Sequence, residues 1–219
     1  MMNLYEYHTN PETLYGYKDR FKIPGFAYEE AKRTGNWTEA EPYIMKDPTY
    51  AYLYARDIRK KGRWPEAEPY IMKDPYSAYW YAMYVMERRW PEAEPYIMKD
   101  PEYAYEYAGG VMGNRWSEAE PYIMKDPKYA YFYAKYVIED EWPEAEPYIM
   151  KDPKYAYFYA MYVMERRWPE AEPYIMKSPE YAYMYARDIR KKGRWPEAEP
   201  YIMKDPESAS KYKAFIRTL

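Results

Sequence analysis

The sequence contains no cysteine, which excludes disulfide bonds, thiolate nucleophiles and cysteine-ligated zinc sites. It has a single histidine, His8, and few serines, so a serine–histidine–aspartate set could be assembled only around that residue. We interpret His8 as a surface or packing residue. No glycine-rich phosphate loop is present either. Together these absences predict a protein that is not an enzyme and that uses no cofactor or metal.

Long apolar runs and an excess of one charge are also missing. With 33 basic and 36 acidic residues the net charge is −3, so no overall field attracts nucleic acid or an anionic membrane. No stretch approaches the ~18 apolar residues of a membrane-spanning helix, and the first residues lack the regions of a signal peptide. We therefore expect a cytoplasmic protein whose partners are proteins or peptides, self-association included, without a membrane partner and with nucleic acid disfavoured.

What the sequence does contain is a repeated phrase, W-P-E-A-E-P-Y-I-M-K-D-P, followed by a tyrosine-rich stretch. Successive copies are 26 or 27 residues apart, and their first residues are Trp37, Trp64, Trp90, Trp116, Trp142, Trp168 and Trp195. A fixed period in this range is typical of stacked repeats, in which each unit buries its apolar face against its neighbours. The pattern predicts an all-α solenoid of about seven two-helix repeats over residues 37–204. Residues 1–36 would form an N-terminal cap and 205–219 a C-terminal capping helix, in one continuous domain.

The first segment of each repeat predicts a short helix that begins directly after the tryptophan. In two copies Thr38 or Ser117 stands at that position, and a glutamate follows three residues later, which is the spacing of a capping box. The tryptophan would then pack on the proline of the first turn, as Trp64 on Pro69. The buried face predicted from helical spacing consists of Ala67, Tyr70 and Ile71.

The second segment opens with Asp-Pro, as at Asp47, and predicts a longer helix. The aspartate can cap the first turn, and proline loses nothing at the first helical position. Ala51 and Ala55 lie one turn apart and allow close helix approach. The tyrosines expected on the flanks of this helix are Tyr50, Tyr52 and Tyr54. In the 27-residue copies Gly62 or Gly193 is expected as the left-handed C-cap.

The two ends of the array differ from the repeats between them. In the last copy Ser208 and Ser210 stand at tyrosine positions and Lys213 at a small-residue position. This predicts a final helix with a polar outer face, as a terminal repeat requires. Near the other end, Ala27 and Ala31 have the spacing of a degenerate second helix.

The phrase W-x-E-A-E-x-x-I-x-x-D-P-x-x-A-x-x-Y-A resembles the short helical-hairpin arrays of uncharacterised tailed-phage and prophage proteins. It is more distantly similar to tetratricopeptide and Sel1 repeats. The resemblance covers about residues 37–206 and implies an all-helical solenoid of phage-like or bacterial origin. It implies no activity, cofactor or site residue. The 26-residue unit is also shorter than the about 34 residues of a tetratricopeptide repeat.

Candidate binding residues lie on the outward side of the second helices, where the copies differ. Two positions one helical turn apart carry aromatic pairs in the central copies and charges in flanking ones. The aromatic residues are Trp80, Tyr84, Phe132, Tyr136, Phe158 and Tyr162. Such a row is typical of a contact surface for a protein or peptide, or of an aromatic-lined groove. We expect a non-catalytic interaction scaffold. The alternative is a protein that binds or sequesters a nucleotide or sugar, and packing within a superhelix could instead bury this face.

One copy carries three glycines, Gly109, Gly110 and Gly113, in its second helix beside Glu106. Each glycine costs roughly 0.5–1 kcal/mol relative to alanine in a helix. Either this copy has drifted under the protection of its neighbours, or the missing side chains leave a notch for a ligand.

Two basic stretches, Arg56–Arg63 and Arg187–Arg194, lie at helix ends. Cations are favourable there because they complement the helix dipole. We interpret both as solvated helix ends in preference to phosphate-binding sites, given the acidic balance elsewhere.

Overall fold

The computed structural model describes residues 20, 22–35, 37–60, 62–190 and 194–218 of the 219-residue chain. Every regular element in these ranges is a helix, which confirms the all-α solenoid. The helices group into two compact units that divide between Met112 and Gly113. His8, Gly193 and residues 1–19 of the expected N-terminal cap lie outside the described ranges. None of the described helices is both long and apolar enough to cross a membrane.

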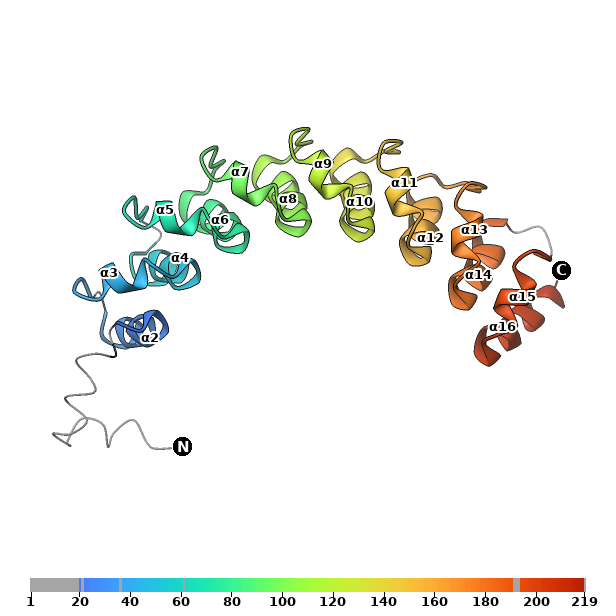
Figure 1. The fold of residues 1–219 in the computed structure, drawn as a ribbon, viewed down its shortest axis with the longest axis horizontal. Helices are drawn as coiled ribbons and strands as arrows, with labels where there is room; N and C mark the ends of the chain where they lie inside the picture. Colours follow the sequence, from blue (N-terminus) through green and yellow to red (C-terminus); the bar gives the residue numbers. More distant parts are fainter. Residues whose placement is uncertain (1–19, 21, 36, 61, 191–193, 219) are drawn as a thin grey trace, which may run out of the picture. The chain divides into compact units, whose positions relative to one another are not determined.

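Within each unit, short and longer helices alternate along the chain, with the short ones on one side and the longer ones on the other (Figure 1). The helices of unit 1 are α2 (Pro24–Thr34), α3 (Glu41–Ile44), α4 (Pro48–Asp57), α5 (Glu68–Ile71), α6 (Pro75–Tyr81), η2 (Ala82–Met86), α7 (Glu94–Ile97), α8 (Pro101–Tyr107) and η3 (Ala108–Met112). The helices of unit 2 are α9 (Glu120–Ile123), α10 (Pro127–Tyr133), η4 (Ala134–Ile138), α11 (Glu146–Ile149), α12 (Pro153–Tyr162), α13 (Glu172–Ile175), α14 (Pro179–Tyr185), η5 (Ala186–Arg190), α15 (Glu199–Ile202) and α16 (Pro206–Ile216).

The start of the second helix follows the expectation. Asp47 precedes α4 with extended backbone, and its carboxylate accepts hydrogen bonds from the amides of Thr49 and Tyr50 at 3.0 and 3.1 Å. Proline at the first position loses no hydrogen bond because that amide has no partner within the helix. Ser178 occupies the same N-cap position before α14, but its side chain makes no capping bond.

The start of the first helix differs from the expectation. The predicted N-cap directly after the tryptophan is wrong, because a turn intervenes and α5 begins only at Glu68. Its N-cap is Ala67, with no side-chain hydrogen bond. This start places Pro69 in the first turn, where a missing amide hydrogen costs nothing. A helix that began two residues earlier, at Glu66, would have required that hydrogen.

The expected left-handed glycine cap is also displaced. Gly62 does not have a positive φ; Lys60 occupies the left-handed position instead, with φ 53°. The residues at the equivalent positions in the next copies are Glu87 (53°), Gly113 (68°), Glu139 (59°) and Glu165 (52°). In most of these copies the helix passes through a π-helical turn before this residue, as η2 does before Glu87. The wider turn and the left-handed residue together direct the chain toward the next tryptophan.

The core includes the tryptophans from Trp64 onward, the paired alanines and, in each second helix, the tyrosine equivalent to Tyr54. Trp64 is 1% exposed, and its ring centre lies 5.1 Å from that of Tyr54 in the preceding second helix. Ala67 and Ile71 are fully buried as expected, whereas Tyr70 is 38% exposed, so its predicted burial is wrong. The flank positions expected for Tyr52 and Tyr54 are also wrong, because these side chains are 1% and 0% exposed.

A polar cluster, which we call the clasp, explains why Tyr54 and the equivalent tyrosines of the other second helices are buried. Tyr81 is the equivalent residue in the next copy. The hydroxyl of Tyr81 accepts a hydrogen bond from the amide of Trp64 at 2.6 Å and donates one to Glu68 at 3.0 Å. Arg63 binds the same carboxylate through two nitrogens, at 2.9 and 2.7 Å. The amide, the hydroxyl, the carboxylate and the guanidinium of this buried corner therefore satisfy one another. The glutamate expected to complete a capping box serves the clasp instead.

The clasp recurs along both units with the same separation of 17 residues between the tryptophan amide and the tyrosine hydroxyl. The clasp tyrosines are Tyr54, Tyr81, Tyr107, Tyr133, Tyr159, Tyr185 and Tyr212. Burial raises the pKa of each, to about 12 for Tyr54. In the copy of Trp142 the arginine position holds Glu141. Burial and this neighbouring carboxylate raise the pKa of Glu146.

The first and last described helices complete the packing of their units. α2 packs on α3 and α4 as a second helix would, and Ala27 and Ala31 are fully buried. In α16, Ser210 is exposed, as a polar outer face requires. Ser208 differs from that expectation: it is only 5% exposed and faces α14.

Candidate binding surface

The aromatic residues predicted as a binding face lie on the second helices, with Trp80 and Tyr84 in unit 1 and the other four in unit 2. Within each pair the rings touch. Trp80 stacks on Tyr84 with ring centres 5.2 Å apart and planes 4° from parallel. In unit 2 the corresponding distances are 6.1 Å for Phe132 and Tyr136 and 6.0 Å for Phe158 and Tyr162.

The pairs share one pattern of exposure. The outer member of each pair is a tyrosine that is 40%, 55% or 47% exposed, for Tyr84, Tyr136 and Tyr162. The inner members, Trp80, Phe132 and Phe158, are half-buried. Packing among the described residues therefore leaves the outer tyrosines open to solvent. The indole nitrogen of Trp80 is buried and has no hydrogen-bond partner among the described residues.

In unit 2 further rings connect the two pairs. Tyr155 lies between Phe132 and Phe158, at 6.3 and 6.4 Å from their ring centres. The ammonium group of Lys135 lies 4.2 Å from the centre of the Tyr162 ring, a cation–π contact. A shallow cavity of about 360 Å³ opens among these side chains. The result is a continuous aromatic surface with a positive charge above it.

The glycines of the predicted notch have separate structural roles. Gly113 begins unit 2 and takes the left-handed backbone position, whereas Glu106, Gly109 and Gly110 lie in unit 1. A Cβ on Gly110 would lie 3.3 Å from the Tyr79 hydroxyl and 3.5 Å from the Met83 methyl. Gly110 thus faces filled space on that side. A small cavity of about 150 Å³ borders it between η2 and η3.

Glu106 itself is exposed on α8. Burial, with the Glu106 carboxylate close by, raises the pKa of Tyr79 to about 12. The carboxylate therefore interacts with the preceding second helix across the repeat boundary.

The arginines of both basic stretches form ion pairs within the chain. Each stretch contains one arginine bound to the adjacent aspartate, one that reaches back to a clasp glutamate, and one that binds the clasp glutamate of the following segment. The pairs are Arg56–Asp57, Arg59–Glu41, Arg63–Glu68, Arg187–Asp188, Arg190–Glu172 and Arg194–Glu199. A phosphate would have to compete with these carboxylates.

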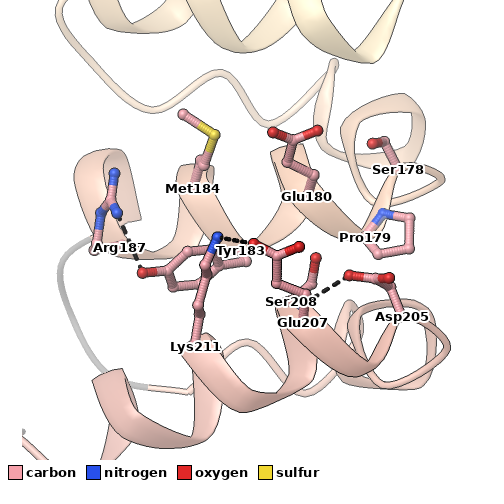
Figure 2. A pocket seen from close by; sticks show the side chains of 10 residues that line it. All are labelled: Ser178, Pro179, Glu180, Tyr183, Met184, Arg187, Asp205, Glu207, Ser208 and Lys211. Carbon is pink, nitrogen blue, oxygen red and sulfur yellow. Dashed lines mark hydrogen bonds and ion pairs between the residues drawn. The ribbon is translucent and has the colours of Figure 1, made fainter.

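A cavity that the sequence interpretation missed is larger than those beside the predicted residues. It lies in unit 2 between α14 and α16 and has a volume of about 820 Å³ (Figure 2). We call it the α14–α16 cavity. Its lining residues are Ser178, Pro179, Glu180, Tyr183, Met184, Arg187, Asp205, Glu207, Ser208 and Lys211. The sequence signal for this cavity is Ser208 at a tyrosine position, where the predicted polar end of the array offers a different explanation.

The side chains of this cavity carry both charges. Arg187 donates a hydrogen bond to the Tyr183 hydroxyl at 3.1 Å, and its guanidinium lies 5.2 Å from the ring centre. Lys211 pairs with Glu207 at 2.6 Å (Figure 2). The described residues contain no group of three or more histidine, cysteine, aspartate and glutamate side chains that could hold a metal.

Comparison with known proteins returned no match among family models, curated proteins or solved structures.

Proposed function

We propose that this chain is a non-catalytic repeat scaffold that binds a protein or peptide through the second-helix face. This name denotes the outward side of the second helices, with the residues Trp80, Tyr84, Phe132, Tyr136, Phe158 and Tyr162. The observation that carries the proposal is the exposure of Tyr84, Tyr136 and Tyr162, each 40% or more, on top of half-buried aromatic rings. Tyrosine and tryptophan are enriched at protein interfaces because they combine a large apolar area with a polar group. Rings that are already stacked lose little conformational freedom on binding.

Constant and variable residues of the repeat have different roles, and this difference supports the proposal. Residues that recur in nearly every copy, such as the clasp tyrosine and glutamate, hold the helices together. The aromatic residues of the second-helix face, such as Trp80 and Tyr84, stand at positions that vary between copies. Burial raises the pKa of the clasp tyrosines Tyr81 and Tyr107, whose hydroxyls already have partners. A scaffold that keeps its packing constant and varies its surface is typical of recognition by repeat proteins.

The test uses a variant that changes only the outer tyrosines. Peptides are selected from a displayed random-peptide library on the wild-type protein, and their affinities are measured for wild type and for Tyr84→Glu/Tyr136→Glu/Tyr162→Glu. We expect at least tenfold weaker binding by the variant, because truncating aromatic anchors typically costs about 2 kcal/mol or more. Helicity and the free energy of unfolding should change little, since the residues are exposed.

A matched control places the same three changes on the opposite side of the repeat, at Tyr70, Tyr96 and Tyr148. This variant should retain the selected peptides. Equal affinity of the peptides for wild type and the first variant would contradict the proposal. Sedimentation of both variants also reports whether the face mediates self-association.

The alternative function is small-molecule binding, which the volume of the α14–α16 cavity favours. At about 820 Å³ it falls within the range of roughly 300–1,000 Å³ typical of ligand pockets. Saturable thermal stabilisation by a nucleotide or sugar, abolished by Tyr183→Ala, would support this function over peptide binding.

A further inference from the structure

One position of the second helix places a ring against the preceding second helix, and we call it the ring-filling position. It lies three residues after the N-cap. The pairs formed have nearly the same geometry in both units: Tyr103 with Tyr79 (6.1 Å, 31°), Tyr155 with Tyr131 (6.1 Å, 33°) and Tyr181 with Tyr157 (6.0 Å, 33°). The space between neighbouring second helices therefore has a defined aromatic occupant.

This occupant covers the ring beneath it. Tyr79, Tyr131 and Tyr157 are only 3–4% exposed. In α16 the ring-filling position holds Ser208, and Tyr183, the residue beneath it, is half-buried instead. The α14–α16 cavity opens at this place (Figure 2). The missing ring therefore accounts for the location of the cavity.

A polar chain end does not account for Ser208. A terminal helix needs polar residues on its outer face, and Ser210 is exposed in that way. Ser208 is 5% exposed and lines the cavity toward α14. The Ser208 amide donates a hydrogen bond to the Asp205 carboxylate at 2.7 Å, so the N-terminus of α16 is capped as that of α4 is.

Unit 1 contains a second copy with serine at the ring-filling position, Ser77. In this copy the underlying tyrosine is nevertheless covered by neighbouring rings. A cavity of about 420 Å³ again adjoins the underlying tyrosine, Tyr52, and its stacked arginine, Arg56. There Tyr76 and Trp80 also line the cavity, and Tyr52 is 1% exposed. Unit 2 has no such neighbouring rings at Tyr183: the residues equivalent to Tyr76 and Trp80 are Glu207 and Lys211.

The side chains at the mouth of the α14–α16 cavity can be displaced. Lys211 and Glu207 are 54% and 76% exposed, and they form an ion pair of the i, i+4 type. Such surface pairs contribute little to stability. The lining also includes the Tyr183 ring, the Arg187 guanidinium and the Met184 thioether. These groups suit a ring, since arginine and methionine both contact aromatic faces and edges favourably.

We propose that the α14–α16 cavity receives an aromatic side chain of the peptide partner, with a tyrosine ring as the fitting group. The ring occupies the place that Tyr155 and Tyr181 occupy in the preceding copies and covers Tyr183. This inference rests on the proposed function, because it names the chemistry that the second-helix face recognises.

The test measures binding of N-acetyl-L-tyrosinamide to the full chain labelled at the methionine methyl groups. We expect a saturable change in the Met184 methyl resonance, since a bound ring shifts nearby nuclei. The methyls of Met124 and Met150, which lie at the ends of the short helices, should not move. N-acetyl-L-leucinamide should bind at least tenfold more weakly because it lacks a ring.

The matched variants are Ser208→Tyr and Ser210→Tyr, which add the same side chain inside and outside the cavity. Ser208→Tyr should abolish binding of the probe and raise the melting temperature by about 2–4 °C, because it restores the missing ring pair. Ser210→Tyr should leave binding unchanged. Unimpaired binding by Ser208→Tyr, equal binding of the leucine probe, or no saturable change at Met184 would each overturn the inference.

The outcomes separate this inference from the proposed function. If the selected peptides depend on Tyr84, Tyr136 and Tyr162 but the tyrosine probe does not bind, the scaffold function stands and the cavity assignment fails. If the selected peptides do not depend on these tyrosines and the tyrosine probe does not bind, the scaffold function and the cavity assignment both fail. Should Ser208→Tyr not fold, Tyr183→Ala removes the floor of the cavity and must also weaken the probe at least tenfold.

Discussion

At the scale of single residues, one tyrosine hydroxyl per repeat joins two helices and the segment between copies. In unit 1 the Tyr81 hydroxyl accepts from the amide of Trp64 and donates to Glu68. Because the hydroxyl is fully buried, neither partner can exchange it for water. Removing it leaves a buried amide without an acceptor, which costs more than the net value of a hydrogen bond.

The first prediction follows from this arrangement. Tyr81→Phe should lower the free energy of unfolding by about 1–3 kcal/mol, the cost of an unsatisfied buried donor. Tyr84→Phe is the control, since Tyr84 is 40% exposed and follows in η2; it should change stability by less than about 0.5 kcal/mol. Urea denaturation followed by circular dichroism measures both. Similar losses for the two variants would contradict the role assigned to the clasp.

The second prediction concerns the tryptophan that opens each repeat. Trp142 is 1% exposed, and its ring centre lies 5.1 Å from that of Tyr133. Trp142→Ala should destabilise the protein by about 3–5 kcal/mol through lost burial and the cavity left behind. Trp37→Ala should cost less, because Trp37 is only half-buried. A loss below about 1 kcal/mol for Trp142→Ala would show that the surroundings collapse into the space.

At the scale of elements, the second helix ends in the same way in successive copies whether or not a glycine is present. The left-handed residue is Glu87, Glu139 or Glu165 in three copies and Gly113 in one. A left-handed conformation costs a residue with a side chain roughly 1–2 kcal/mol. The packing of the next tryptophan and its clasp therefore determines the helix exit and overrides this local cost.

The third prediction tests this cost directly. A Cβ at Gly113 would meet nothing within 4 Å, so Gly113→Ala introduces backbone strain without a clash. It should lower the free energy of unfolding by about 1 kcal/mol. Glu139→Ala exchanges one side chain for another at the same backbone position and should change stability by less than about 0.5 kcal/mol. Thermal and urea unfolding of both variants provide the comparison; an unchanged Gly113→Ala would show that the chain relaxes at this exit.

At the scale of the whole molecule, the clasps give the described fold a common response to alkaline pH. Burial raises the pKa of every clasp tyrosine, to about 12 for Tyr54, while in the unfolded chain a tyrosine titrates near about 10. The stabilising contribution is complete below the unfolded-state pKa. Above it the unfolded chain loses protons that the folded protein retains, so stability falls as pH rises.

The fourth prediction is therefore a steep loss of stability above about pH 10, by up to ~1.4 kcal/mol per pH unit for each clasp tyrosine. Tyrosinate absorbance and circular dichroism recorded together against pH measure it, and the clasp tyrosines should ionise together with unfolding. Tyr81→Phe, which lacks one such group, should show a shallower dependence. Ionisation of all tyrosines near pH 10 with the helices intact would contradict the assignment.

Features set by neighbours in the sequence could be predicted. The second helix begins at Asp47 because a carboxylate can bind amides two and three residues ahead, whatever the rest of the chain does. The pair Ala51 and Ala55 identified the buried stripe, because a spacing of four residues places both on one face of a helix. The candidate face at Trp80 and Tyr84 also followed from sequence, because variation among near-identical copies falls on positions that the core does not require.

The errors arose where tyrosine had to be assigned to the core or to the surface. Tyr54 and Tyr70 are the same residue type in neighbouring helices, yet one is completely buried and the other 38% exposed. A tyrosine suits either environment, since it has an apolar ring and a polar end. The period, the helix class and the aspartate caps of the second helices were determined by the sequence alone, because each depends on interactions within a few residues. Which tyrosines are buried, where the helix exits turn left-handed, and that Ser208 leaves a cavity rather than a polar surface were decided only by the tertiary structure, because the partners in those contacts come from adjacent repeats.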